Sequence, residues 1–289
     1  MIRRLPIWFR QELPDDISQA TSRFFRESSV DTVCGAAKCP NTAVCFRQKR
    51  MTFLILGKVC TRNCAFCNIA KNDSSVLSLD KDEPMRVAQV IKALGLNYAV
   101  ITSVTRDDLT DGGAGVFAET IFWIRKINGL STKIEVLIPD FQGKTSSLGK
   151  IIEASPDLIA HNLETVKRLY PEVRPSADYQ RSLELLRKVK LLNSNIPTKS
   201  SLMLGMGETK EELLETMLDL RQALCDCLCL GQYLAPSLKH YPVAEFLTPA
   251  QFAGYRNIAR EMGFKVVLSA PLARGSYKAQ SVYQELGNV

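Results

Sequence analysis

Three cysteines, Cys60, Cys64 and Cys67, form a C-x3-C-x2-C pattern in the segment CTRNCAFC, directly after an apolar, strand-like run. Three thiolates at this spacing can bind three irons of a cuboidal four-iron cluster and leave the fourth iron without a protein ligand. An open iron can bind a small molecule. The pattern therefore predicts an iron–sulfur centre that takes a substrate.

A zinc site is the alternative for the same cysteines. Structural zinc takes four protein ligands, usually from paired cysteine knuckles. The two histidines of the chain, His161 and His240, are both distant in sequence and make completion of a zinc site awkward. The number of available ligands favours the four-iron cluster.

A second triplet precedes the first. Cys34, Cys39 and Cys45 form C-x4-C-x5-C in a loop-like stretch that contains Pro40 and Asn41, two residues typical of turns. Six of the nine cysteines therefore fall in one short window. In a reducing compartment such a cluster of cysteines indicates metal binding rather than disulfides.

The remaining cysteines, Cys225, Cys227 and Cys229, alternate with other residues. In a strand this spacing places all three on one face, where they could form a third metal site. Cysteine is also among the residues most often buried. We therefore expect a packed strand at these positions.

Apolar, β-rich runs alternate with amphipathic, helix-length segments from Met51 onward. Strands are expected at Met51–Leu56, Tyr98–Ser103, Lys133–Ile138, Asp157–Ala160, Thr198–Leu204 and Cys227–Leu234. Helices are expected at Glu83–Leu94, Val116–Asn128, Leu148–Ala154, Tyr179–Leu192, Lys210–Leu224 and Pro249–Met262. Nearly continuous apolar strands between helices predict an α/β fold, a parallel sheet covered on both faces or closed into a barrel. Six strands predict a partial (β/α)6 barrel with its chemistry at the C-terminal ends of the strands.

Two parts lie outside this alternation. Residues 1–50 read as an irregular, cysteine-bearing extension, and residues 271–289 show no strong periodicity. We expect one barrel domain over residues 51–270 with these two extensions wrapped onto it.

Composition and charge narrow the class of protein. No run approaches the roughly 18 apolar residues that span a bilayer, and residues 1–14 lack the apolar core of a secretory signal. A cytoplasmic protein without membrane contact is expected. The net charge of +7 is modest and the basic runs lack interleaved aromatic residues, so nucleic-acid binding is not expected. A basic patch that docks an acidic protein fits equally well.

The first triplet, with Phe66 before its last cysteine, resembles the radical S-adenosylmethionine (SAM) superfamily. The two triplets together, with 14 residues between them, resemble the lipoyl synthase family. The resemblance covers nearly the whole chain. It continues, in the family's order, through LPIWFRQELP, ITSVTRDDLTDGGA, HNLETVKRLYPEVRP, DYQRSLELL, PTKSSLMLGMGET and LGQYLAPS.

This resemblance implies a barrel of the radical SAM type with two [4Fe–4S] clusters. The radical SAM cluster would be held by Cys60, Cys64 and Cys67, and the auxiliary cluster by Cys34, Cys39 and Cys45. The family takes the fourth auxiliary ligand, a serine, from an R-S-S-Y motif near the C-terminus.

The corresponding segment of this chain is RGSY, Arg274–Tyr277. Gly275 replaces the first serine, and Ser276 becomes the ligand that the resemblance implies. An oxygen ligand suits a cluster that must come apart, because a thiolate would hold iron more firmly. Without the resemblance of the rest of the chain, the segment RGSY would be interpreted as an ordinary polar turn.

The resemblance also implies contacts with SAM. Asn162 and Glu164 stand where the family contacts SAM, although a helix start would use the same residue types. Thr102 and Ser103 follow a strand and could bind SAM or position substrate, with a solvated loop as the alternative. The segment SLMLGMGE, up to Glu208, resembles the superfamily's G-x-I-x-G-x-x-E strand end near the SAM adenine. Its first glycine is Ser201 here, and a buried strand before a helix explains the segment equally well.

The family inserts two sulfur atoms at C6 and C8 of an octanoyl chain on a lysine of a lipoyl carrier domain, with two SAM molecules cleaved and the auxiliary cluster consumed as sulfur donor. Unactivated methylene carbons have no useful acidity, which fits the absence of a Ser-His-Asp signature, so no acid–base catalytic residue is predicted. The implied partners are octanoylated carriers (2-oxoacid dehydrogenase E2 subunits and the glycine cleavage H protein), a one-electron reductant such as flavodoxin or ferredoxin, and an iron–sulfur carrier.

Two other readings stay open at this point. The chain could be another two-cluster radical SAM sulfurtransferase that acts on a different acyl or peptide substrate. It could also be a non-catalytic iron–sulfur carrier or zinc-binding scaffold, although neither needs an open iron or a barrel mouth.

Overall fold

The computed structural model describes residues 5–11, 13–71 and 78–287. Residues 1–4 and 12, within the N-terminal segment read above for a secretory signal, lie outside the described residues. In the described ranges, none of the helices combines the length and the apolar run that crossing a membrane needs.

The fold centres on one sheet whose strand order is β1-β2-β5-β6-β7-β8-β9-β10. All neighbours from β2 to β10 are parallel, and only β1 pairs antiparallel with β2. The strands are β1 (Asp31–Thr32), β2 (Thr52–Ile55), β5 (Tyr98–Ser103), β6 (Lys133–Leu137), β7 (Leu158–Ala160), β8 (Thr198–Leu204), β9 (Cys227–Gln232) and β10 (Val266–Ser269). In the described part of the chain β1 and β10 end the order, so the barrel stays open.

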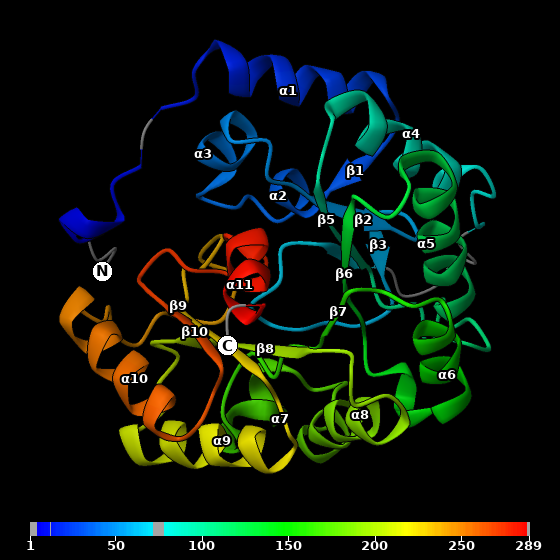
Figure 1. Cartoon of the computed structure of the whole chain (residues 1–289). Helices are drawn as coiled ribbons and strands as arrows, with labels where there is room; N and C mark the ends of the chain where they lie inside the picture. Colours follow the sequence, from blue (N-terminus) through cyan, green and yellow to red (C-terminus); the bar gives the residue numbers. More distant parts are fainter. Residues whose placement is uncertain (1–4, 12, 72–77, 288–289) are drawn as a thin grey trace.

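Helices cover the outer face of this sheet (Figure 1). They are α4 (Glu83–Leu94), α5 (Ala114–Asn128), α6 (Thr145–Glu153), α7 (Tyr170–Val173), α8 (Tyr179–Leu192), α9 (Lys210–Gln222) and α10 (Pro249–Glu261). Separate 3-10 turns lie at Ile7–Phe9, Phe141–Gly143 and Lys167–Leu169. One core packs β2, β5 and β6 against α4–α6. A second core packs β8–β10 against α8–α10. Both faces of the strands are buried, which explains their almost uninterrupted apolar sequence.

The α/β partial-barrel prediction is confirmed, and all six expected strands and six expected helices are present. The sheet has one more parallel strand than predicted, since β10 follows α10 and extends the barrel. Val266–Ser269 is only four residues long. So short an apolar run has no reliable periodicity of its own.

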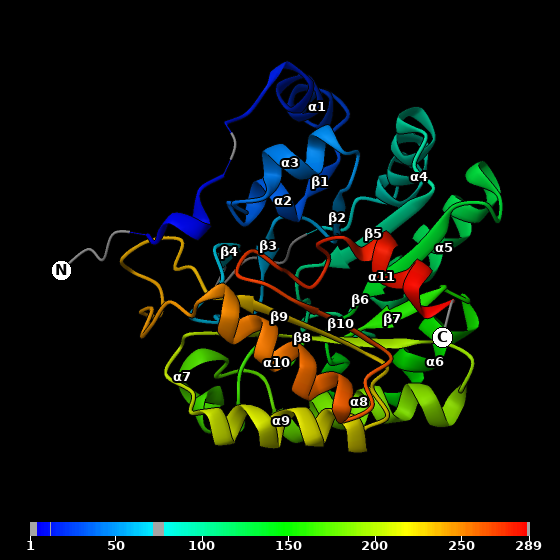
Figure 2. The ribbon, with the colours of Figure 1, turned by 60° about the vertical axis from the view of Figure 1, so that its left-hand side comes forward.

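The N-terminal extension is not irregular, contrary to the sequence-based expectation. It contains α1 (Asp16–Glu27), α2 (Val33–Ala36) and α3 (Thr42–Arg47), and strand β1 joins it to the barrel sheet. Figures 1 and 2 show the three helices gathered beside β2. Asp15 caps α1 by accepting a hydrogen bond from the Ser18 amide, and Phe25 buries the inner face of α1 against Phe46 and Phe53.

The C-terminal segment also forms a helix that the sequence did not predict, α11 (Ala279–Leu286). Figure 1 shows α11 inside the ring of strands. Ala279 and Tyr283 pack against Tyr98 at the start of β5, while Val282 packs against the start of β9 and β10. Helix α11 therefore plugs the N-terminal end of the barrel and leaves the opposite end for a cavity.

A buried ion pair lies inside the barrel. Lys199 Nζ is 2.5 Å from Glu135 Oε1, with the two side chains 2% and 1% exposed. The Tyr98 hydroxyl donates a hydrogen bond to the other carboxylate oxygen at 2.8 Å. Removing one partner of such a pair leaves an uncompensated buried charge.

We expect Lys199→Met to destabilise the chain by about 3–5 kcal/mol, because the Glu135 carboxyl would be left buried without its cationic partner. The free energy of unfolding of the metal-free chain in urea measures the effect. The Lys199→Met, Glu135→Gln double variant should recover part of the loss. Lys265→Met, which breaks a half-exposed pair with Asp226, is the control and should cost less than about 1 kcal/mol. A loss equally small for Lys199→Met would contradict the role given to the pair.

Candidate active site

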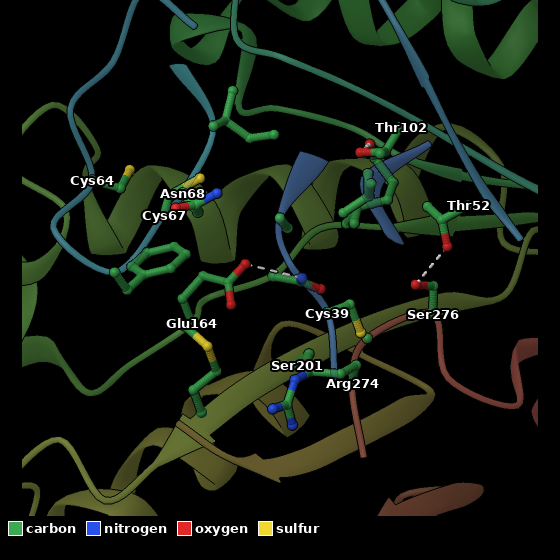
Figure 3. Close-up of a pocket in the computed structure, with 18 of the residues that line it drawn as sticks. Cys39, Thr52, Cys64, Cys67, Asn68, Thr102, Glu164, Ser201, Arg274 and Ser276 are labelled. Atoms are coloured by element: carbon green, nitrogen blue, oxygen red, sulfur yellow. Dashed lines mark hydrogen bonds between the residues drawn. The ribbon is translucent and has the colours of Figure 1, made fainter. Parts of the chain in front are cut away.

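One cavity of about 530 Å³ lies at the C-terminal ends of the strands, the place expected for the chemistry. It brings together residues from three distant parts of the sequence. From the predicted set it is lined by Cys34, Cys39, Cys60, Cys64, Cys67, Thr102, Ser103, Asn162, Glu164 and Ser276. Figure 3 shows Cys64 and Cys67 on one side of this pocket, and Cys39 and Ser276 on the other.

The Cys60–Cys67 loop is closed at its base by a small parallel sheet, β3 (Val59–Cys60) with β4 (Ala70–Lys71). Its tip is fixed because the Ala65 amide donates to the Val173 carbonyl at 2.9 Å. The Ala65 carbonyl in turn accepts from the Tyr241 amide at 2.9 Å. The loop is thus held from two sides in a shape that turns the three thiols toward the cavity.

Arg62, between the first two cysteines, anchors the same loop electrostatically. Its guanidinium is 5% exposed and lies 2.6 Å from both Asp107 and Asp140. Burial alone would raise the pKa of Asp140, but the hydrogen bond and charge of Arg62 outweigh it and hold that pKa well below its usual range. Asp140 also pairs with Arg181 at 2.8 Å, so the loop is tied to the end of β6.

The second triplet forms a compact unit beside the first. Cys34 lies in α2, Cys45 lies in α3, and Cys39 lies between the helices. The Thr42 hydroxyl donates to the carbonyls of Cys34 and Cys39 at 2.9 and 2.8 Å. Asn68, just after the first triplet, donates to the Ala36 carbonyl at 3.0 Å. This bond joins the two cysteine loops directly.

Two hydrogen bonds connect the C-terminal segment to the second triplet region and to strand β2. The buried Asn41 amide donates to the Leu272 carbonyl at 2.7 Å. The Thr52 hydroxyl donates to Ser276 Oγ at 2.7 Å, the dashed contact labelled in Figure 3. Ser276 therefore presents its oxygen to the cavity with a hydrogen-bond donor already in place to stabilise negative charge on it.

Burial raises the pKa values of three thiols in the two triplets. It raises the pKa of Cys34 to about 12 and those of Cys45 and Cys67 to about 11. The neighbouring thiols of the same triplet raise the pKa values of Cys34 and Cys67 further. All nine cysteines are free of disulfides, and iron must displace protons from buried thiols to bind.

The thiol geometry fits clusters better than single ions. Within the described residues, no group of three or more His, Cys, Asp and Glu side chains is placed to hold one metal ion. In a cuboidal cluster each thiolate binds a different iron, so the ligands stand farther apart than around zinc. The three partly exposed cysteines of the first triplet face a cavity with space beside them, so a cluster with an open iron stays the prediction for them.

The cavity wall between the two triplets is polar. Asn162 Nδ2 donates to Glu164 Oε1 at 3.0 Å, and burial raises the pKa of Glu164. Arg174 donates from Nη1 to the Asn162 and Leu163 carbonyls, each at 3.0 Å. The Thr102 hydroxyl is bound to the Leu137 carbonyl at 2.8 Å. These groups form a hydrogen-bonding face suited to a polar cosubstrate.

Glu208, predicted as a SAM contact, does not line this cavity. Its carboxylate accepts hydrogen bonds from the Gly205 amide at 2.6 Å and from the Met206 amide at 2.9 Å. It therefore shapes the loop after β8, and its contact with SAM stays a prediction.

The alternating cysteines are buried, as expected, but they do not share one face. Cys225 precedes β9 and joins the outer core with Leu228 and Leu230. Cys227 faces α11 inside the barrel, and Cys229 Sγ lies 3.1 Å from the Arg274 carbonyl. The expectation of a single face was wrong because Cys225 lies in the turn before the strand.

Sequence reasoning missed several residues of the site. Arg62 and Asn68 lie next to the cysteines of the first triplet, and Arg174 lies in the PEVRP part of a motif given above. Their nearness in sequence to these motifs was the signal that could have identified them. His161 lines the cavity and is 2% exposed. Its Nδ1 lies 2.8 Å from the Ile138 carbonyl. Burial lowers its pKa to about 4, which makes it a neutral hydrogen-bonding group at physiological pH.

Comparisons with known proteins address the same features. Residues 54–220 match the radical SAM superfamily. The lipoyl synthase of Caldicellulosiruptor bescii is 52% identical over 277 residues, which cover 95% of this chain and 92% of that protein. The lipoyl synthase of Caldanaerobacter subterraneus subsp. tengcongensis is 49% identical, over 96% of this chain and 97% of that protein.

The chain belongs to the lipoyl synthase family. This family of sulfurtransferases lies within the radical SAM superfamily, which uses a [4Fe–4S] cluster and SAM. Solved structures agree on the fold alone. Methylornithine synthase aligns with a TM-score of 0.56 at 14% identity, over 82% of this chain and 81% of that chain. A maturase of the [FeFe]-hydrogenase aligns with a TM-score of 0.56 at 15% sequence identity, over 97% of this chain and 62% of that chain.

The depressed pKa of His161 predicts acid sensitivity. The unfolded chain binds a proton on this residue below about pH 6.5, whereas the folded chain resists protonation until about pH 4. Neutral His161 therefore contributes about 3 kcal/mol to the free energy of unfolding above pH 6.5, and this contribution is lost as the pH falls toward 4. Urea unfolding of the metal-free chain between pH 4 and 7 measures this slope. His161→Gln should flatten it, while His240→Gln, outside the cavity lining, should not. An unchanged slope in His161→Gln would refute the assignment.

Proposed function

We propose that this chain is a lipoyl synthase that inserts two sulfur atoms at C6 and C8 of an octanoyl chain bound to a lysine of a lipoyl carrier domain. The observation that carries the proposal is the shared cavity. The whole first triplet, Cys34 and Cys39 of the second, and Ser276 line it at the mouth of one barrel. Cys45 does not line the cavity and lies buried in α3 behind it. The sequence identity to lipoyl synthases over nearly the full length supports it.

In this proposal Cys60, Cys64 and Cys67 hold the radical SAM cluster. The auxiliary cluster is held by Cys34, Cys39, Cys45 and Ser276. When bound, the first cluster supplies an electron for reductive cleavage of SAM and the second supplies sulfur. Their ligands lie on opposite sides of the same pocket (Figure 3), so a chain between them would reach both.

The protein's own residues bind, orient and exclude water. Asn162, Glu164 and Thr102 would bind SAM, with Ser103 beside them at the end of β5 and Glu208 acting through its loop. Apolar side chains, including Leu54, Leu137, Ile138, Leu202 and Met203, line the rest of the cavity. A dry, apolar wall suits an acyl chain and protects a carbon radical from competing hydrogen donors.

The remaining assignments follow the same proposal. The carriers are 2-oxoacid dehydrogenase E2 subunits or the glycine cleavage H protein, the reductant is a flavodoxin or ferredoxin, and an iron–sulfur carrier rebuilds the auxiliary cluster. Free thiols and clusters require a reducing compartment, for which we propose the cytoplasm. The chain divides into an extension (residues 1–50), a barrel (51–270) and a second extension (271–289).

The two triplets should fail differently when altered. Cys34→Ala should keep SAM cleavage but lose sulfur insertion, because it removes only an auxiliary ligand. Cys60→Ala should lose both, since cleavage of SAM precedes sulfur insertion. Anaerobic turnover with an octanoylated carrier peptide, SAM and dithionite, read by mass spectrometry, measures both products.

A matched control is Cys225→Ala, which removes a buried cysteine far from both sets. This variant should retain both products. Comparable losses of SAM cleavage in Cys34→Ala and Cys60→Ala would refute the division of roles.

Ser276 provides a separate test. Ser276→Ala should lower the iron content of the reconstituted chain and abolish sulfur insertion while SAM cleavage continues. Ser276→Cys should retain iron yet insert sulfur more slowly, because a softer thiolate holds iron more firmly than an oxygen ligand. Iron analysis and the turnover assay measure both effects. Full sulfur insertion by Ser276→Ala would remove Ser276 from the ligand set.

A further inference from the structure

The two departures from the family's sequence patterns meet in space. Ser201 replaces the first glycine of the strand-end motif, and Gly275 replaces the first serine of R-S-S-Y. These positions are far apart in the chain, yet a Cβ at position 275 would lie 3.5 Å from the Cβ of Ser201, at van der Waals contact. Both residues line the cavity, and Figure 3 shows Ser201 beside Arg274.

The lack of a side chain at Gly275 is not required by its backbone. Its φ lies outside the left-handed region that favours glycine. The constraint is instead a close neighbour, because a Cβ at this position would approach Asn162 Nδ2 to 3.1 Å and Oδ1 to 3.3 Å. These distances are shorter than comfortable carbon–polar contacts, so either Asn162 or the C-terminal segment would have to move.

Asn162 has little freedom to move. Its Nδ2 is bound to Glu164 Oε1 at 3.0 Å, and its backbone carbonyl accepts from Arg174. Glu164 is fixed in turn by β8, because its amide donates to the Ser201 carbonyl at 2.9 Å and its carbonyl accepts from the Met203 amide at 2.8 Å. The Glu164 φ of 69° is a strained value for a residue with a side chain, and the two hydrogen bonds to β8 hold it.

The Asn162 amide oxygen is buried and has no hydrogen-bond partner among the described residues. A ligand in the cavity with a hydroxyl or amino donor would satisfy it. Asn162 lies between β8, which fixes its partner Glu164, and the C-terminal segment at Gly275.

We propose that Ser201 and Gly275 are a complementary pair of positioning residues that hold Asn162 for SAM. At their contact strand β8 carries a side chain and the C-terminal segment carries none, so the Ser201 side chain alone fills the space beside Asn162. This inference rests on the proposed function, in which Asn162 contacts SAM. It predicts that the two positions are energetically coupled.

The test is a double-mutant cycle on the reconstituted full chain, with the dissociation constant of SAM measured by anaerobic equilibrium dialysis without reductant. Gly275→Ser should weaken SAM binding about tenfold, the effect of misplacing one good hydrogen bond. Ser201→Gly in that background should restore the affinity to within about threefold, because loss of the Ser201 Cβ lets the C-terminal segment shift away from Asn162.

Ser201→Ala in the Gly275→Ser background is the matched control. It keeps the Cβ of residue 201 and should not restore binding. The thermal midpoint of each variant separates positioning from folding, since a merely structural pair would change the midpoint and leave SAM affinity unchanged. Independent effects in the cycle, or equal rescue by Ser201→Ala, would overturn the inference.

Failure of the proposed function has a different signature. If the unmodified reconstituted chain binds no SAM, the proposed function is wrong. A chain that binds SAM but shows independent effects of the two substitutions on SAM affinity instead overturns the pair alone. Coupling confined to the thermal midpoints marks a merely structural pair and also overturns the positioning role.

Discussion

Hydrogen bonds that tie the C-terminal segment to the N-terminal extension and to the barrel hold the site together. Asn41 of the extension donates to the Leu272 carbonyl, and Thr52 of strand β2 donates to Ser276. The C-terminal segment is therefore fixed from both sides at the barrel mouth. The barrel supplies a third fixed point through Asn68, which joins the loop after β3 to α2. The site is therefore an assembly of three segments on one rigid sheet.

Burial of charge is the second constraint on this site. Without metal, the thiols of Cys34, Cys45 and Cys67 stay protonated because burial raises their pKa values. Iron binding replaces those protons and leaves anionic ligands in a largely apolar cavity. Two buried guanidiniums, those of Arg62 and Arg174, and the guanidinium of the partly exposed Arg274 line the same cavity and can balance that charge.

The sequence predicted the barrel strands well because each central strand is a continuous apolar run, and only β10 was too short to recognise. Cysteine spacing identified both triplets as candidate site residues because each triplet lies within one short segment of sequence. The partners of Arg62 could not be predicted in this way, since Asp140 lies far along the chain and only the parallel sheet brings it close. Helix α1 was missed because its sequence is mostly polar, and its few buried positions become clear only against Phe46 and Phe53.

Helix α11 makes the barrel interior a blind pocket. Its side chains pack on the first residues of β5, β9 and β10, so among the described residues the N-terminal end of the barrel is filled and molecules that react in the cavity enter from the opposite end. An acyl chain that remains tethered to its carrier would occupy that opening between the two sulfur insertions. Spent nucleoside and methionine would then have to leave, and fresh cosubstrate arrive, past the tethered arm. The order in which cosubstrate binds and products are released at the cavity entrance would then limit turnover, independently of the chemical steps in the cavity.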